Sequence, residues 1–206
     1  MRHWGASPDP TRVVEYFSHE ASGYHTRSTR FPWAWARVCE STAIRSLLGN
    51  IAGIEVLELG AGSGYYTCEL IRSGAHHVWA VDLSDAMLAA LPKSTVTPIV
   101  GDAETICLDK RFPVLLSAGM LEFVRDPVAV LVNAARHAEP GGRLVLLAPQ
   151  ASALGCVYRW FHHRHGIDIH LFDRTWFETM APRSGWQVHA VVRVLPFSLV
   201  VRLHRV

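Results

Sequence analysis

The fold of this chain is decided by the stretch Val56-Leu57-Glu58-Leu59-Gly60-Ala61-Gly62-Ser63-Gly64. Its first part is apolar apart from one carboxylate, as in a short buried strand, and its second part holds three glycines. Glycines let the backbone turn tightly and let a ligand approach main-chain atoms that a Cβ would cover. A strand that enters such a loop before a helix is typical of α/β ligand-binding folds, although a plain strand–helix turn gives the same pattern.

Helix-like and strand-like segments alternate along the chain. Apolar periodicity and turn residues predict helices over residues 10–25, 33–50, 66–73, 84–91, 126–138 and 173–180. They predict strands over residues 54–59, 77–81, 97–100, 114–117 and 143–148. This alternation indicates a parallel sheet with helices on both faces, and the nearly all-apolar strands fit burial on both sides. Two further strands, 186–195 and 197–204, are expected to pair as an antiparallel hairpin around Pro196.

The composition narrows the class of protein. The chain has 206 residues, of which half are hydrophobic and 18% are charged, and this excludes a disordered chain. The formal net charge of +2 gives no reason to expect nucleic acid. We expect no secretory leader, because residues 1–10 contain no apolar stretch, and the apolar runs are far shorter than the roughly 20 residues that span a bilayer. Four widely spaced cysteines indicate reduced thiols. We therefore expect a cytoplasmic protein with no metal, nucleic-acid or membrane partner.

The spacing of the glycines separates two classes of cofactor. A dinucleotide fingerprint G-x-G-x-x-G would need glycine at position 65, where this chain has Tyr65. Asp82, at the end of the second expected strand, is placed to accept the two hydroxyls of a ribose in either case. Glu58 stands beside the loop, where a carboxylate suits a cationic amine better than a pyrophosphate. These residues favour a nucleoside that carries a positively charged amino-acid tail.

At these residues the chain resembles the class I S-adenosylmethionine-dependent methyltransferases. The likeness extends in the family's order over residues 54–150, through the glycine loop, Asp82, Gly101-Asp102-Ala103-Glu104, Leu121-Glu122-Phe123-Val124 with Asp126-Pro127, and Pro140-Gly141-Gly142. It implies a Rossmann-like three-layer α/β sandwich with a mostly parallel seven-stranded sheet, strand order 3-2-1-4-5-7-6 and strand 7 antiparallel. The chain departs from the family at Pro113, where many members have Asp, and we interpret this as a local structural variation.

The resemblance also implies a cofactor, S-adenosylmethionine, with S-adenosylhomocysteine as its product. The positions that would border its amino-acid portion and ribose are Glu58, Gly60, Ala61, Gly62, Gly64 and Asp82. The positions that would contact adenine or line the reactive end are Leu83, Met87, Asp102, Ala103, Ser117 and Leu121. A tyrosine of an N-terminal helix often closes over the cofactor in this family, which makes Tyr16 and Tyr24 candidates, although ordinary helix packing explains either.

The acceptor of the methyl group is expected between residues 10–35 and 151–172, outside the motifs. The second segment is rich in aromatic and histidine side chains, which suit an apolar or aromatic small molecule, and the candidate contacts are Tyr16, Tyr158 and Phe161. An oxygen or nitrogen acceptor needs a base within reach. The candidate bases are Glu122, His165 and His170.

Each candidate base has a structural alternative. Glu122 also fits a carboxylate that is favoured near a helix N-terminus by the helix dipole. The histidines fit the solvated edge of a helix that caps the substrate. A zinc site is disfavoured, because the H-H-x-H spacing of His162, His163 and His165 is not a standard ligand pattern.

We interpret residues 1–206 as a single methyltransferase domain. It divides into an N-terminal helical cap (1–50), a cofactor-binding core (54–150), a substrate cap (151–172) and a helix with a C-terminal β-hairpin (173–206). The expected activity is methyl transfer to a small, fairly apolar metabolite, at an oxygen, nitrogen or carbon atom. One alternative is a NAD(P)-dependent oxidoreductase, but this chain has neither the third glycine of the dinucleotide motif nor the Tyr-x-x-x-Lys motif that such an enzyme requires. The other is a non-catalytic binding protein with the same fold. The oligomeric state stays open.

Overall fold

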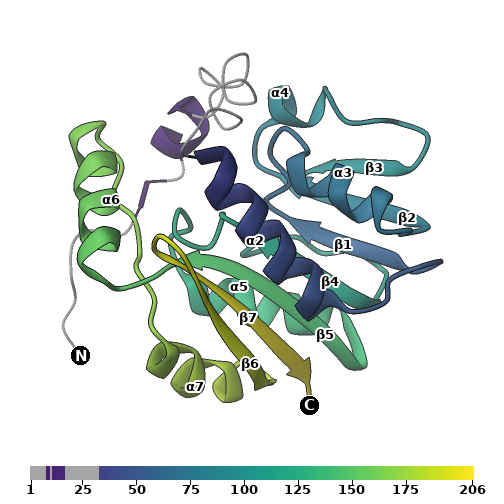
Figure 1. Ribbon diagram of the computed structural model, residues 1–206. Coiled ribbons are helices and arrows are strands. Elements are labelled where there is room, and N and C mark those ends of the chain that lie inside the picture. Colours follow the sequence, from purple (N-terminus) through teal and green to yellow (C-terminus); the bar gives the residue numbers. More distant parts are fainter. Residues whose placement is uncertain (1–7, 10, 17–32) are drawn as a thin grey trace.

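The computed structural model describes residues 8–9, 11–16 and 33–206. Residues 11–16 form a short helix, and a seven-stranded sheet occupies the centre of the described part (Figure 1). Tyr24 and the remainder of the helix expected over residues 10–25 lie outside the described residues.

The sheet confirms the predicted topology. Its strands are β1 (Glu55–Leu59), β2 (His77–Asp82), β3 (Val96–Val100), β4 (Phe112–Ala118), β5 (Ala138–Pro149), β6 (Trp186–Val194) and β7 (Ser198–Arg205). They lie in the order β3-β2-β1-β4-β5-β7-β6. The pairs from β3 to β5 are parallel, and β7 is antiparallel to both β5 and β6. Because strand order reverses between β1 and β4, a crevice is expected at the carboxyl ends of these strands.

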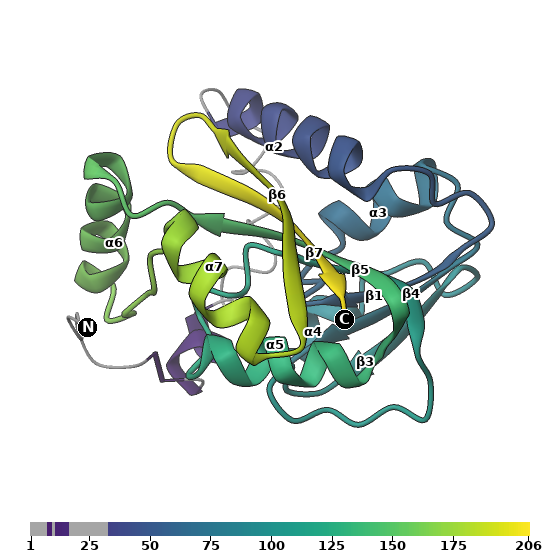
Figure 2. The ribbon, with the colours of Figure 1, turned by 90° about the horizontal axis from the view of Figure 1, so that it is seen from below.

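Helices cover both faces of the sheet. Helices α2 (Trp33–Leu48) and α3 (Tyr65–Arg72) lie on one face, and α5 (Pro127–Arg136) and α7 (Arg174–Arg183) lie on the other (Figures 1 and 2). The short α4 (Asp85–Leu88) follows β2, and α6 (Ala153–Arg164) stands at one end of the molecule. Side chains alternate between the two faces of each strand, so that Val56 packs in the core beneath α2 and α3 while Leu57 packs in the core of α5 and α7.

The start of β5 differs from the expected strand. This strand begins at Ala138 rather than near Arg143, and its pairing with β4 shifts register between Phe112 and Val114. Residues 139–142 therefore stand opposite Pro113 alone, as in a wide irregular bulge. The structural variation inferred at Pro113 is present as this bulge.

Two expectations about helices need correction. The apolar residues of the second expected helix predict a buried face that includes Val38, but Val38 is 61% exposed, because it lies about 200° around the helix from buried Ala36. Helix α4 ends at Leu88, earlier than the expected Leu91. Ser84 caps its N-terminus, since the Met87 N–H donates to Ser84 Oγ over 3.4 Å.

Candidate active site

A cleft opens at the carboxyl ends of the central strands, beside the point where strand order reverses. It encloses about 1030 Å³ including its open mouth. Its walls in the described structure come from the glycine loop, the ends of β2 and β3, the segment after β4, and residues 13–14 of the short first helix.

The glycine loop adopts backbone conformations that favour glycine. Gly60, Gly62 and Gly64 have φ angles of +77°, +54° and +88°. A Cβ at Gly60 would lie 2.4 Å from the Met120 side chain, whereas a Cβ at Gly62 would have no atom within 4 Å. The main chain at Gly62 is therefore open toward the cleft that it lines.

Asp82 fixes this loop to the end of β2. Its Oδ2 accepts from the Gly62 N–H over 2.8 Å, and its Oδ1 accepts from the Ser84 N–H over 2.9 Å. Burial raises the pKa of this carboxyl, and the backbone hydrogen bonds from Ser84, Gly62 and Leu83 oppose the shift. The carboxylate is thus oriented by the backbone on both sides while it lines the cleft.

The end of β3 provides a second polar wall. Asp102 lines the cleft, and its Oδ1 accepts from the Glu104 N–H over 2.8 Å. The Ala103 carbonyl accepts from Asn133 Nδ2 of α5 over 3.1 Å, which fixes the neighbouring backbone. Leu83 and Met87 add apolar surface to the same part of the cleft.

Most positions expected to contact the cofactor line this cleft. These are Gly60, Ala61, Gly62, Asp82, Leu83, Met87, Asp102 and Ala103. Gly64 does not, because it packs against Leu91. Tyr24 lies outside the described residues.

Glu58 does not line the cleft either. Alternation along β1 directs its side chain beneath the loop toward α3, where it is 2% exposed and accepts from Thr67 Oγ1 over 2.6 Å. Burial, together with the nearby Asp82 charge, raises the pKa of Glu58 to about 8. Its place near the amino group of the cofactor stays a prediction.

Ser117 and Leu121 are also displaced from their expected places. Both are fully buried, and the cleft wall after β4 is formed by Ala118, Gly119 and Met120. The alternation along β4 explains this, since Ser117 shares a strand face with Leu115 in the core of α5 and α7.

A polar cluster lies beside the cleft, formed by the half-buried Arg37 and Glu40 and the buried Tyr66, Glu122 and Ser198. Glu40 accepts from Ser198 Oγ over 2.6 Å and from the Tyr66 hydroxyl over 3.4 Å. Glu122 is 4% exposed, and its Oε2 has no hydrogen-bond partner among the described residues. Burial raises the pKa of Glu122 to about 8; the Glu40 charge adds to this effect and the Arg37 charge opposes it. Glu122 does not line the cleft, but its neighbour Phe123 and Arg37 do.

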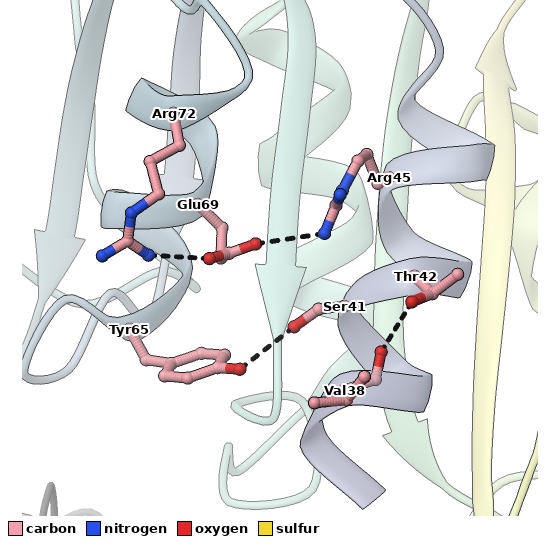
Figure 3. A network of polar contacts seen from close by, with 7 residues as sticks. All are labelled: Val38, Ser41, Thr42, Arg45, Tyr65, Glu69 and Arg72. Carbon is pink, nitrogen blue, oxygen red and sulfur yellow. Dashed lines mark hydrogen bonds and ion pairs between the residues drawn. The ribbon is translucent and has the colours of Figure 1, made fainter. Parts of the chain in front are cut away.

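Helix α2 is joined to α3 by polar contacts, which Figure 3 shows from close by. Ser41 Oγ lies 3.3 Å from the Tyr65 hydroxyl, and Glu69 lies between Arg45 and Arg72 at 3.4 and 2.8 Å. The Arg37 guanidinium lies 4.9 Å from the centre of the Tyr65 ring. These contacts place Tyr65 and Arg37 at the cleft, where both form part of the wall.

Sequence reasoning did not assign Arg37, Glu40 or Tyr65 to the site. Arg37 and Glu40 are one helical turn apart and therefore share a face of α2, which is the signal that could have found them. In the sequence, Tyr65 is notable only because it stands where a dinucleotide-binding motif would have glycine.

The candidate acceptor residues pack behind the cleft rather than in its wall. Tyr16 makes edge contacts with His162, at 6.2 Å between ring centres, and Tyr158 stacks on Phe197 at 4.9 Å. Phe161 is 49% exposed on α6. Of the short first helix, it is Val13 and Val14 that line the cleft.

The candidate bases His165 and His170 also lie away from the cleft wall. His165 is exposed and its Nδ1 lies 2.9 Å from the Phe161 carbonyl, since it ends α6. His170 has its Nε2 3.0 Å from the Val124 carbonyl and donates its backbone N–H to the Glu122 carbonyl. Burial lowers the pKa of His170. Its contacts hold the segment that carries Glu122, and no group of three or more described His, Cys, Asp or Glu residues is arranged to hold a metal ion.

The topology and the cleft together define a class of protein. A seven-stranded sheet with an antiparallel seventh strand, and a glycine loop fixed to a strand-end aspartate, are those of the Rossmann-like methyltransferase fold.

Comparison with known proteins agrees with this class. Residues 57–146 match the family model described as "Methyltransferase domain". The chain is 33% identical over 155 residues to the demethylmenaquinone methyltransferase of Corynebacterium glutamicum strain R, a match that covers 73% of this chain and 66% of that protein. It is 31% identical over 128 residues to the tRNA U34 carboxymethyltransferase of Idiomarina loihiensis, covering 57% of this chain and 38% of that protein.

A solved structure has the same fold over nearly the whole chain. The magnesium protoporphyrin IX methyltransferase of Synechocystis PCC 6803, with bound SAH, aligns with a TM-score of 0.77 at 17% identity and covers 96% of this chain and 100% of that chain. The chain belongs to the class I S-adenosylmethionine-dependent methyltransferases, and S-adenosylmethionine is the cofactor of this family. It spans 66% of the length of the demethylmenaquinone methyltransferase that it matches, just under two thirds.

Proposed function

We propose that this chain transfers the methyl group of S-adenosylmethionine to a small, fairly apolar acceptor molecule. The observation that carries the proposal is the cleft itself: Asp82 and the open backbone at Gly62 lie at one side, and apolar side chains beside a buried carboxyl group lie at the other. This combination supports a site for a nucleoside and, next to it, a largely apolar space for the acceptor, beside a carboxyl group that could accept a proton.

The cleft residues fit the cofactor chemically. The Asp82 carboxylate suits two ribose hydroxyls, and each of its oxygens keeps acceptor capacity beyond the one backbone N–H that it binds. Leu83 and Met87 offer an apolar surface for a purine, and Asp102 offers an acceptor at the end of β3. S-adenosylmethionine, when bound, supplies an electrophilic methyl group on a sulfonium sulfur.

We propose Glu122 as the group that receives the proton of the acceptor. The lone pair of the acceptor atom forms a bond to the methyl carbon as the carbon–sulfur bond breaks, and the electron pair of that bond stays on sulfur. An acceptor proton is then lost to the Glu122 carboxylate, which lies next to Phe123 of the cleft wall. The cleft walls hold the two reactants together and exclude water.

The acceptor class rests on the walls of the cleft. Val13, Val14, Met120, Phe123 and Val124 line it and favour an apolar molecule. The demethylmenaquinone methyltransferases among the relatives support a small apolar acceptor of this kind. The tRNA U34 carboxymethyltransferase relative makes tRNA the alternative to be tested.

Calorimetric titration tests the cofactor site. S-adenosylmethionine and S-adenosylhomocysteine should bind and NAD should not. Asp82→Ala should weaken binding by roughly 1–3 kcal/mol, because the ribose hydroxyls and the Gly62 N–H lose an acceptor. Asp85→Asn, an exposed change in the first turn of α4, is the control and should bind normally. Binding of NAD alone would overturn the proposal.

A labelled methyl donor tests the acceptor and the base. We expect transfer to an apolar quinol such as demethylmenaquinol and none to tRNA; transfer to tRNA alone would refute the small-molecule assignment. Glu122→Gln should lower kcat by about 100-fold or more with little change in KM for the cofactor. The wild-type rate should rise toward pH 8, where Glu122 ionises, and the rate of the Gln variant should not. Equal pH profiles would remove Glu122 from the reaction.

A further inference from the structure

Helix α6 exposes an unusual amount of apolar surface. Leu154, Val157, Trp160 and Phe161 are 54%, 59%, 57% and 49% exposed. Their spacing of three and four residues places them on one side of the helix. The opposite side carries Gly155 and His162, which are the buried residues of this helix. The helix thus has two apolar sides, one turned to the protein and one turned outward.

The charges on α6 have a single sign. Residues Ala153–Arg164 include no Asp or Glu, and Arg159 and Arg164 are their charged side chains. The Arg164 guanidinium lies 4.9 Å from the centre of the exposed Trp160 ring, so that cation and aromatic ring form one surface. Arg164 is two helical turns after Val157 and lies within the outward stripe, whereas Arg159 is turned toward the side of Gly155 and His162. An outward apolar stripe with Trp and Phe and an arginine among them resembles helices that lie in a membrane interface.

The inner side of α6 is connected to the cleft. Tyr158 and His162 of this helix contact the aromatic cluster that includes Phe123, with ring centres 5.4 Å apart for Phe123 and His162. Val13 belongs to the same apolar cluster, and both Val13 and Phe123 line the cleft. A molecule that entered from the surface bearing α6 would meet apolar side chains as far as the cleft.

We propose that α6 docks the protein on the surface of an anionic lipid bilayer. The outer stripe would enter the boundary between headgroups and acyl chains, and Arg164 would face lipid phosphates. No helix in the described part of the chain is long and apolar enough to cross a membrane, and surface docking requires none. The proposal replaces the expectation from the sequence that the protein has no membrane partner, and it does not depend on methyl transfer.

The charge pattern favours a bilayer over a second copy of the chain. In a two-fold dimer each copy presents the same surface, so this stripe would bring the positive charge of Arg164 from both copies into one interface. An anionic membrane instead supplies the opposite charge. Figures 1 and 2 both show α6 at one extremity of the molecule, where a flat surface can reach it.

Flotation of the full chain with vesicles tests the proposal. The protein should float with vesicles of phosphatidylglycerol and phosphatidylcholine, should float less with phosphatidylcholine alone, and should be released by high salt. Val157→Asp and Trp160→Ser should each weaken vesicle binding about tenfold. Arg164→Gln should weaken it about fivefold, the loss of one cation near the headgroups.

Val206→Asp is the matched control. Val206 is 72% exposed and lies at the end of β7, apart from α6 in both views, so this variant should bind vesicles like the wild type (Figures 1 and 2). Circular dichroism and unfolding temperature check that all variants fold. Absence of wild-type flotation, or equal flotation of the Val157 and Val206 variants, would overturn the proposal. Dimerisation that Val157→Asp abolishes, without vesicle binding, would assign the surface to a second copy instead.

Discussion

Glu58 and Glu122 are carboxyl groups that the fold removes from water. Each has a pKa raised to about 8, chiefly by burial, and each is therefore mostly uncharged near neutral pH in the absence of ligand. The neutral form has the lower free energy in such surroundings, because burying an isolated charge is far more unfavourable than burying a protonated carboxyl group.

The stability of the protein should consequently decrease as pH rises from about 6.5 to 8. Both pKa values are raised above 4.5, so the folded state holds more protons than the unfolded state in this range, and the stabilising contribution is lost as pH passes the folded pKa. The decrease is steeper above pH 6.5, because below that pH buried His162, with its pKa lowered to about 4, has the opposite effect and offsets part of it. Urea unfolding at several pH values measures the slope.

Glu58→Gln provides the test of the assignment. The amide keeps an oxygen that accepts from Thr67 and removes the titration, so the variant should lose part of the pH dependence while staying folded. A slope identical to that of the wild type would mean that Glu58 is already ionised at neutral pH.

For single residues, the sequence predicts which residue types belong to the site better than it predicts where their side chains point. Asp82 and Asp102 lie in the cleft because each ends a strand at the same edge of the sheet, which their spacing from the motifs indicates. Glu58 and Ser117 precede the ends of their strands, so their directions depend on strand alternation relative to the helices, which a motif does not specify.

The glycine loop is the element on which the site depends. Gly60→Ala should destabilise the protein more than Gly62→Ala, because both residues have positive φ angles but only a Cβ at Gly60 would meet Met120, at 2.4 Å. The backbone term alone is about 1–2 kcal/mol. Urea unfolding measures the order of the two variants.

The same pair separates stability from binding. Gly62→Ala should cause only a small loss of stability but a large loss of affinity for S-adenosylmethionine. The reason is that the new Cβ would lie beside the open cleft. If Gly62→Ala proved the more destabilising change and bound the cofactor normally, the proposed approach of the ligand to this backbone would be wrong.

Elements were predictable where local signals are strong. Ser84 and the Pro127 position mark the starts of α4 and α5, because caps and N-terminal prolines act within one turn. The early start of β5 could not be predicted, because it depends on pairing with Phe112 across a bulge, and this contact joins residues that are distant in sequence. The substrate-cap role of residues 151–172 stays a prediction, as do the other domain boundaries.

For the whole molecule, cofactor binding should appear as thermal stabilisation. A ligand at 100 times its Kd stabilises the folded state by about 2.7 kcal/mol. For a chain of this size that corresponds to an increase in Tm of roughly 5–10 °C. Differential scanning calorimetry with S-adenosylhomocysteine should show this shift for the wild type and a smaller one for Asp82→Ala at the same concentration. An increase with NAD instead would contradict the cofactor assignment.

The position of β7 has a consequence for how the protein is made. This strand is synthesised after β6 but lies between β5 and β6, so the edge strand has no partner in the sheet until β7 has left the ribosome. Ser198, at the start of β7, also donates to Glu40, which is 158 residues earlier in the chain. The polar cluster beside the cleft therefore cannot be completed on a nascent chain, and the growing polypeptide gains the cofactor loop well before it gains a finished acceptor site.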